Sequence, residues 1–131
     1  MDHLGIAVDE LAPALARYRE TFAAELVHRE VIAEQGVEVA LLEVGGEHIE
    51  LLAPLAQDTP VGRFLAKRGP GIHHVAYGVR DIDATLAQLL ARDVEMIDTT
   101  PRIGLRASRV AFVHPRATGG VLTEIVEAAS P

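Results

Sequence analysis

The sequence predicts an α+β fold built of two tandem βαβββ modules, and three observations support this prediction. The first is an internal repeat, because His3 falls on His74 at an offset of 71 residues. Towards the end of each half the offset becomes 74 residues, and Glu50-Leu51-Leu52 falls on Glu124-Ile125-Val126. The second is the alternation of apolar and small residues after each of these histidines, which is the period of a β-strand. The third is an apolar stripe of helical period that follows each first strand.

The first half is expected to run as a strand, a helix and three further strands. The opening strand covers residues 2–8, and a helix that Asp9 can cap continues to about Ala24. The three further strands are expected at 25–32, 37–44 and 47–53, with a tight hairpin turn at Gly45-Gly46. A short linker helix begins at Asp58-Thr59-Pro60 and ends near Gly69-Pro70.

The second half repeats this plan after the strand that carries His74. We expect a helix over 81–91, a short strand over 94–97, a loop over 99–107, and strands over 109–114 and 121–127. The modules, about 1–56 and about 71–131 with the linker helix at about 57–70, are expected to form a single domain over 1–131. Each module would have a helix on one face of its strands. Together the modules would form one curved mixed sheet, and its open faces would surround a metal cleft.

Composition narrows the classes of function. The 131 residues carry a net charge of −7 with scattered Lys and Arg, which argues against nucleic acid or an anionic membrane as partner. The chain has no cysteine, so disulfides and thiolate metal sites are excluded. It shows neither a basic-then-apolar leader nor an apolar run of membrane-spanning length, which predicts a cytoplasmic protein.

Strand parity gathers four polar side chains that could hold a metal ion. His3 and His74 are equivalent in the repeat, and so are Glu50 and Glu124. A lone histidine or glutamate is more often an ordinary structural or surface residue, but the correlated placement in both halves favours a shared site. Two imidazoles and two carboxylates suit Co²⁺, Mn²⁺, Fe²⁺, Ni²⁺ or Zn²⁺, and leave two octahedral positions for a bidentate oxygen ligand.

The other histidines lack this pairing. His73 aligns with Asp2 on the opposite face of its strand, which indicates a structural role. His28 and His48 have no match in the other repeat and are expected at the surface or around the site. His114 precedes a proline and is expected in a turn.

Several segments resemble a known family. They are Asp2-His3-Leu4-Gly5-Ile6-Ala7-Val8, Glu34-Gln35-Gly36-Val37, Ile49-Glu50-Leu51-Leu52-Ala53-Pro54-Leu55, Phe64-Leu65-Ala66-Lys67-Arg68-Gly69, Gly71-Ile72-His73-His74-Val75-Ala76, His114-Pro115 and Gly119-Gly120-Val121-Leu122. Their order and spacing resemble the vicinal oxygen chelate superfamily, and within it the methylmalonyl-CoA epimerases. The resemblance implies a homodimer in which His3, His74 and Glu124 bind a metal, with Co²⁺ as the expected ion. Glu50 would occupy the fourth ligand position, which is Gln in some members and Glu in others.

The implied reaction interconverts (2R)- and (2S)-methylmalonyl-CoA. A divalent ion can chelate one oxygen of the thioester and one of the carboxylate, and so stabilise the enolate formed when the C2 proton leaves. Epimerisation then needs a proton removed from one face and returned to the other, and we assign these roles to Glu124 and Glu50.

Two departures from the family pattern bear on this assignment. Some epimerases carry a further glutamate, proposed as a base, where this chain has Val39; the adjacent Glu38 should face the other way. The loop before Arg109 is usually Gly-rich but here reads Ile103-Gly104-Leu105-Arg106-Ala107-Ser108. Arg106, Ser108 and the loop amides are candidates for holding the substrate carboxylate or CoA phosphates, although a solvated loop explains the segment equally well.

Two other functions remain open on sequence alone. A glyoxalase I-type lactoylglutathione lyase would use nearly the same His/Glu set on a glutathione adduct. A metal-free small-molecule-binding resistance protein of the same fold would need none of the four ligands.

Overall fold

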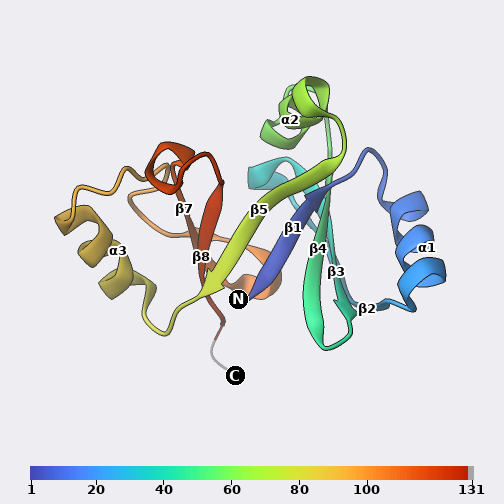
Figure 1. The fold of residues 1–131 in the computed structure, drawn as a ribbon, viewed down its shortest axis with the longest axis horizontal. Coiled ribbons are helices and arrows are strands. Elements are labelled where there is room, and N and C mark those ends of the chain that lie inside the picture. Colours follow the sequence, from blue (N-terminus) through green and yellow to red (C-terminus); the bar gives the residue numbers. More distant parts are fainter. Residues whose placement is uncertain (130–131) are drawn as a thin grey trace. The chain divides into compact units, whose positions relative to one another are not determined.

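The computed structural model describes residues 1–129 and confirms the α+β class with two βαβββ modules (Figure 1). The first module comprises β1 (His3–Ala7), α1 (Leu11–Phe22), β2 (Glu25–Ile32), β3 (Val37–Val44) and β4 (Glu47–Pro54). After α2 (Pro60–Arg68), the second comprises β5 (Gly71–Gly78), α3 (Ile82–Ala91), β6 (Arg102–Ile103), β7 (Arg109–Val113) and β8 (Thr123–Glu127). No helix among the described residues is both long and apolar enough to span a membrane.

The chain folds into two compact units. The N-terminal unit covers residues 3–73, and the C-terminal unit contains residues 1–2 together with the chain from His74 onward. The first two residues belong to the second unit because the Asp2 N–H donates a hydrogen bond to the Ala76 carbonyl at 2.8 Å. Strand β5 begins in the N-terminal unit and continues in the C-terminal one.

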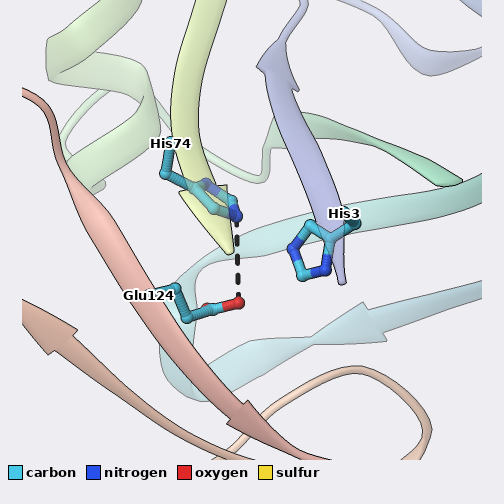
Figure 2. Close-up of side chains that lie close together, drawn as sticks. All are labelled: His3, His74 and Glu124. Carbon is cyan, nitrogen blue, oxygen red and sulfur yellow. Dashed lines mark ion pairs between the residues drawn. The ribbon is translucent and has the colours of Figure 1, made fainter. Parts of the chain in front are cut away.

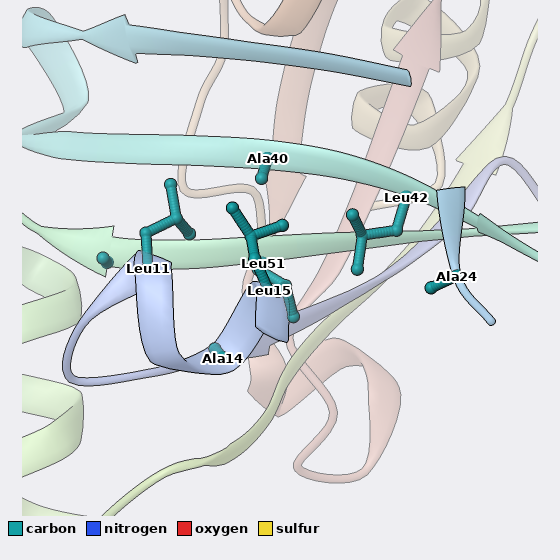
Figure 3. Close-up of a cluster of buried hydrophobic side chains, with 8 residues drawn as sticks. Leu11, Ala14, Leu15, Ala24, Ala40, Leu42 and Leu51 are labelled. Carbon is teal, nitrogen blue, oxygen red and sulfur yellow. The ribbon is translucent and has the colours of Figure 1, made fainter. Parts of the chain in front are cut away.

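The N-terminal unit is a four-stranded sheet with α1 on one face. Its strands follow the order β2-β3-β4-β1, and β1 pairs with β4 in parallel while the other pairs are antiparallel. Helix α1 packs on the sheet through Leu11, Ala14 and Leu15 (Figure 3). Its partners in this buried cluster are Ala24, Ala40, Leu42, Leu51 and Ala53. Since neighbouring strand residues alternate between faces, the side chains of His48 and Glu50 lie on the face of β4 opposite α1.

The C-terminal unit repeats the arrangement with α3 as its helix. The strand order is β5-β8-β7-β6, with β5 and β8 parallel. Helix α3 buries Ile82 and Leu86 against Ala111 and Ile125. The Asp81 side chain caps α3 by accepting the Ala84 N–H at 3.0 Å. Glu124, one residue before Ile125, therefore lies on the face that α3 leaves open.

Helix starts were predicted with mixed success. Helix α2 begins as expected, because Thr59 Oγ1 accepts the Gly62 N–H at 3.1 Å and Pro60 occupies the first turn. The expected cap of α1 was wrong, because the N-cap residue is Glu10 rather than Asp9 and it makes no side-chain capping bond. The stability of α1 thus comes from its apolar face rather than from its cap.

The strand expected over 94–97 is the main error in the predicted fold. Only Met96 forms an isolated bridge, to Val113, and the regular strand β6 lies further on at Arg102–Ile103, inside the expected loop. The cause is Asp98, whose carboxylate accepts the Phe112 N–H at 2.9 Å. This side chain takes the place of a strand carbonyl, so the ladder is interrupted and resumes four residues later.

Candidate metal centre

The C-terminal unit buries a histidine and a glutamate side by side. His74 lies on β5 and Glu124 on β8, where the parallel register places Ala76 opposite Glu124. The His74 Nε2 atom is 3.9 Å from Glu124 Oε1 (Figure 2), and the two side chains are 1% and 7% exposed. Both residues offer an atom that can ligate a metal ion.

The N-terminal unit contains an equivalent pair. His3 lies on β1 and Glu50 on β4, and the parallel register places Gly5 opposite Glu50. The distance from His3 Nε2 to Glu50 Oε2 is 3.6 Å, and both side chains are buried. In each module, therefore, the residue opposite the glutamate lies two positions after the histidine. This shared arrangement confirms the internal repeat at atomic detail.

The two side chains of each pair are close without forming a direct hydrogen bond to each other. A nitrogen–oxygen hydrogen bond spans 2.7–3.2 Å, and both distances exceed this range. Two atoms that each lie about 2.1 Å from one ion are roughly 3.0–3.4 Å apart at coordination angles of about 90–110°, so both pairs are a few tenths of an ångström wider than two ligands on one ion. Burial of two carboxylates and two imidazoles also requires compensation of charge, which a divalent ion supplies. The donor set of both pairs thus fits a divalent metal.

Further polar residues share the face of the N-terminal sheet that carries Glu50. In the register, Leu41 lies opposite both Glu50 and His28, and Glu30 lies opposite Val39. A register shift between Leu26 and His28 determines which residues of β2 lie on this face of the sheet. His28 Nε2 lies 3.2 Å from Glu30 Oε1, so the two form a pair at this face. The sequence prediction missed Glu30, because the parity of β2 depends on this bulge.

The position that is glutamate in some relatives is buried and apolar here. Val39 is 1% exposed, and Glu38 faces the opposite side of the sheet, where its Oε2 accepts a hydrogen bond from Arg29 Nε at 3.1 Å. The expectation that Glu38 faces away is confirmed, so it cannot take the place of a base at residue 39.

The C-terminal sheet face adds an aromatic ring and an arginine. Phe112 lies opposite Glu124 in the β7–β8 register, and its ring meets the His74 ring edge-on at 5.6 Å. Arg102 lies opposite Val110, two residues from Phe112 on the same face. Sequence reasoning placed Arg102 in a loop and so did not assign it to this face.

Two other histidines have the expected local roles. The His114 Nδ1 atom accepts the Arg116 N–H at 3.1 Å and so caps a 3₁₀ turn, which confirms a turn residue. The His73 ring packs edge-on against Phe64 at 4.9 Å. Burial lowers the pKa of His73 to about 4, so this ring is neutral at pH 7.

The loop before β7 adopts the backbone that glycine favours, although it lacks glycine at those positions. Arg106 and Ala107 have φ values of 54° and 57°, both in the left-handed region. The Gly104 N–H donates to the Ser108 carbonyl at 2.9 Å and closes the loop. Ser108 is buried, at 7% exposure. The loop therefore keeps a conformation that glycine adopts easily, and the backbone of Arg106 and Ala107 is strained in it.

Replacing Ala107 by glycine is expected to raise the free energy of unfolding by about 0.5–1 kcal/mol, because the left-handed strain of an L-residue exceeds the added entropy of the unfolded chain. Chemical unfolding measures this change. Ala87→Gly, on the exposed side of α3, is the matched control and should lower the free energy of unfolding by about 1 kcal/mol. Equal losses in both variants would contradict the prediction.

Comparison with known proteins extends these observations to the whole chain. The sequence model of the Glyoxalase/Bleomycin resistance protein/Dioxygenase superfamily matches residues 2–112. The crystal structure of methylmalonyl-CoA epimerase from Mycobacterium tuberculosis matches with a TM-score of 0.95 and 42% identity, over 98% of this chain and 87% of that one. A variant of the Streptomyces coelicolor methylmalonyl-CoA epimerase, in complex with 2-nitronate-propionyl-CoA, matches with a TM-score of 0.95 and 40% identity, over 99% and 97%. The human mitochondrial methylmalonyl-CoA epimerase is 33% identical over 129 residues, which are 98% of this chain and 73% of the human one.

Proposed function

Since the chain belongs to the methylmalonyl-CoA epimerases of the glyoxalase/bleomycin resistance protein/dioxygenase superfamily, we propose that it interconverts (2R)- and (2S)-methylmalonyl-CoA. The observation that carries the proposal is the recurrence of a buried His–Glu pair at equivalent positions of both modules. A chain that only bound a small molecule would not need this donor set. The named relatives also favour the epimerase over a lactoylglutathione lyase.

In this proposal the two pairs hold one divalent ion. His3, His74 and Glu124 are ligands, and Glu50 is the fourth. When bound, the ion would supply a Lewis acid that stabilises negative charge on the thioester oxygen of the substrate. Co²⁺ is the metal we propose, because a set of nitrogen and oxygen ligands without thiolate suits it; Mn²⁺, Ni²⁺ and Zn²⁺ share that preference.

The two glutamates are proposed to move the proton at C2, since metal ligation by each carboxylate is partly exchangeable with proton transfer. The Glu124 carboxylate removes the proton from one face, and the electron pair of the C–H bond moves towards the thioester oxygen to give the enolate. Glu50, in its protonated form, returns a proton to C2 from the other face, and the thioester carbonyl is restored. Because both side chains are buried, proton transfer at C2 by the glutamates is favoured over direct transfer by bulk water.

The same proposal includes the assembly and location of the protein. We expect the two units to act as a single domain over 1–131. We also expect a homodimer, which light scattering would show as twice the mass of one chain. A cytoplasmic location is expected, and cell fractionation would test it.

The decisive experiment is hydrogen exchange in D₂O. Metal-stripped protein is incubated with (2R)-methylmalonyl-CoA, with and without Co²⁺. Deuterium at C2 and conversion to the 2S form are expected only with the metal. Absence of exchange in both conditions would overturn the epimerase proposal, and a glutathione hemithioacetal would then be the next substrate.

A further inference from the structure

Arg102 lies on the open face of the C-terminal sheet, the face that carries Glu124. It begins β6 opposite Val110, and two residues further along β7 Phe112 lies opposite Glu124. Residues opposite each other in antiparallel strands share a face, as do residues two apart on one strand. The side chains of Arg102, Phe112 and Glu124 therefore leave the sheet on the side away from α3.

The guanidinium of Arg102 has a fixed place on this face. Its central carbon lies 5.9 Å from the centre of the Phe112 ring, and that ring touches the His74 ring. Its Nε atom lies 3.1 Å from Asp98 Oδ1. The other oxygen of Asp98 accepts the Phe112 N–H, so the carboxylate that holds Arg102 is itself held by the sheet. Stacking and ion pairing together orient the guanidinium.

The Nε donor of Arg102 is nonetheless unfilled. Although Nε lies close to Asp98, the alignment is not that of a hydrogen bond, and this buried nitrogen has no hydrogen-bond partner. Arg109 and Arg116 of the same unit differ from Arg102, because Arg109 donates two hydrogen bonds to Asp83 and Arg116 donates two to Glu95. The Arg102 side chain is 40% exposed, which leaves its terminal nitrogens accessible to a ligand.

We propose that Arg102 binds an anionic oxygen of the acyl-CoA substrate, with Asp98 and Phe112 as positioning residues. The proposal rests on the proposed function, since it concerns the substrate of the same site. A guanidinium presents paired donors that match carboxylate and phosphate oxygens. In methylmalonyl-CoA these oxygens belong to the malonyl carboxylate or to the phosphates of CoA, and the experiment separates the two sources.

The test compares Arg102→Gln with the wild type on two substrates, methylmalonyl-CoA and the methylmalonyl thioester of N-acetylcysteamine, which lacks phosphate. The KM for methylmalonyl-CoA is expected to rise about 10- to 100-fold with a much smaller change in kcat, because a charge-assisted contact to substrate is lost. Arg102→Lys should recover part of the loss. A rise with both substrates assigns the contact to the carboxylate, and a rise with the CoA ester alone assigns it to a phosphate.

Controls separate this proposal from the proposed function. Arg116→Gln also removes a guanidinium of the C-terminal unit, and its KM should equal that of the wild type. Wild-type protein that exchanges C2 in D₂O while Arg102→Gln keeps the wild-type KM on both substrates would overturn the role of Arg102 alone. Wild-type protein without any exchange would instead overturn the proposed function. Should Arg102→Gln not fold, as judged by circular dichroism, Arg102→Met, which keeps the aliphatic stem without charge or donors, carries the test, and an unchanged KM there refutes the contact.

Discussion

Replacing Glu124 by glutamine is expected to lower deuterium exchange at C2 of (2R)-methylmalonyl-CoA by at least about 1,000-fold. The amide has the shape of the carboxylate but cannot accept the C2 proton. Glu124 is buried at 5% exposure, so a water molecule from bulk solvent cannot readily take over its role. Mass spectrometry of the substrate after incubation in D₂O measures the exchange, and the metal content of the variant is determined in the same samples.

Glu50→Gln is the matched control, because Glu50 lies at the equivalent position of the other module, with His3 as its neighbour. An amide oxygen can still ligate a metal, so this variant should retain the ion. If Glu50 acts on the second face of C2, the Glu50→Gln protein should still exchange the C2 hydrogen of one epimer. It should no longer convert that epimer into the other. A Glu124→Gln protein that binds metal and exchanges C2 at the wild-type rate would show that Glu124 is not the base.

Much of the fold could be predicted because its information is local or repeated. The order βαβββ in both halves follows from strand and helix periodicity, and the offset between His3 and His74 states the repeat directly. Parity and the repeat together placed four residues on the sheet faces that the helices leave open, and the structure shows all four buried: His3, Glu50, His74 and Glu124.

What the sequence did not reveal depends on contacts between distant segments. Asp98 interrupts the strand ladder through a hydrogen bond to Phe112, fourteen residues away, and thereby moves β6 to Arg102–Ile103. The bulge at Leu26/His28 sets which residues of β2 face the site. Neither interaction has a signal in local periodicity, so Arg102 and Glu30 could be assigned to these sheet faces only once strand register was known.

The second large effect concerns the metal itself. Addition of Co²⁺ to metal-free wild-type protein is expected to raise its thermal midpoint, because a ligand that binds only the folded state adds about 2.7 kcal/mol at 100 times its Kd. His74→Ala should weaken Co²⁺ binding by more than about 100-fold, since loss of a residue that merely orients a ligand already costs 10- to 100-fold. Calorimetric titration and thermal melts measure the two effects without reference to activity.

His114→Ala serves as the matched control, because this histidine caps a surface turn of the same unit and should leave Co²⁺ binding unchanged. The comparison distinguishes a specific site from binding by any accessible imidazole, since His114 is more exposed than the buried His74. If the buried pairs hold the ion, removing the less accessible ring must have the larger effect. Equal loss in both variants, or Co²⁺ binding by His74→Ala with wild-type affinity, would exclude His74 as a ligand.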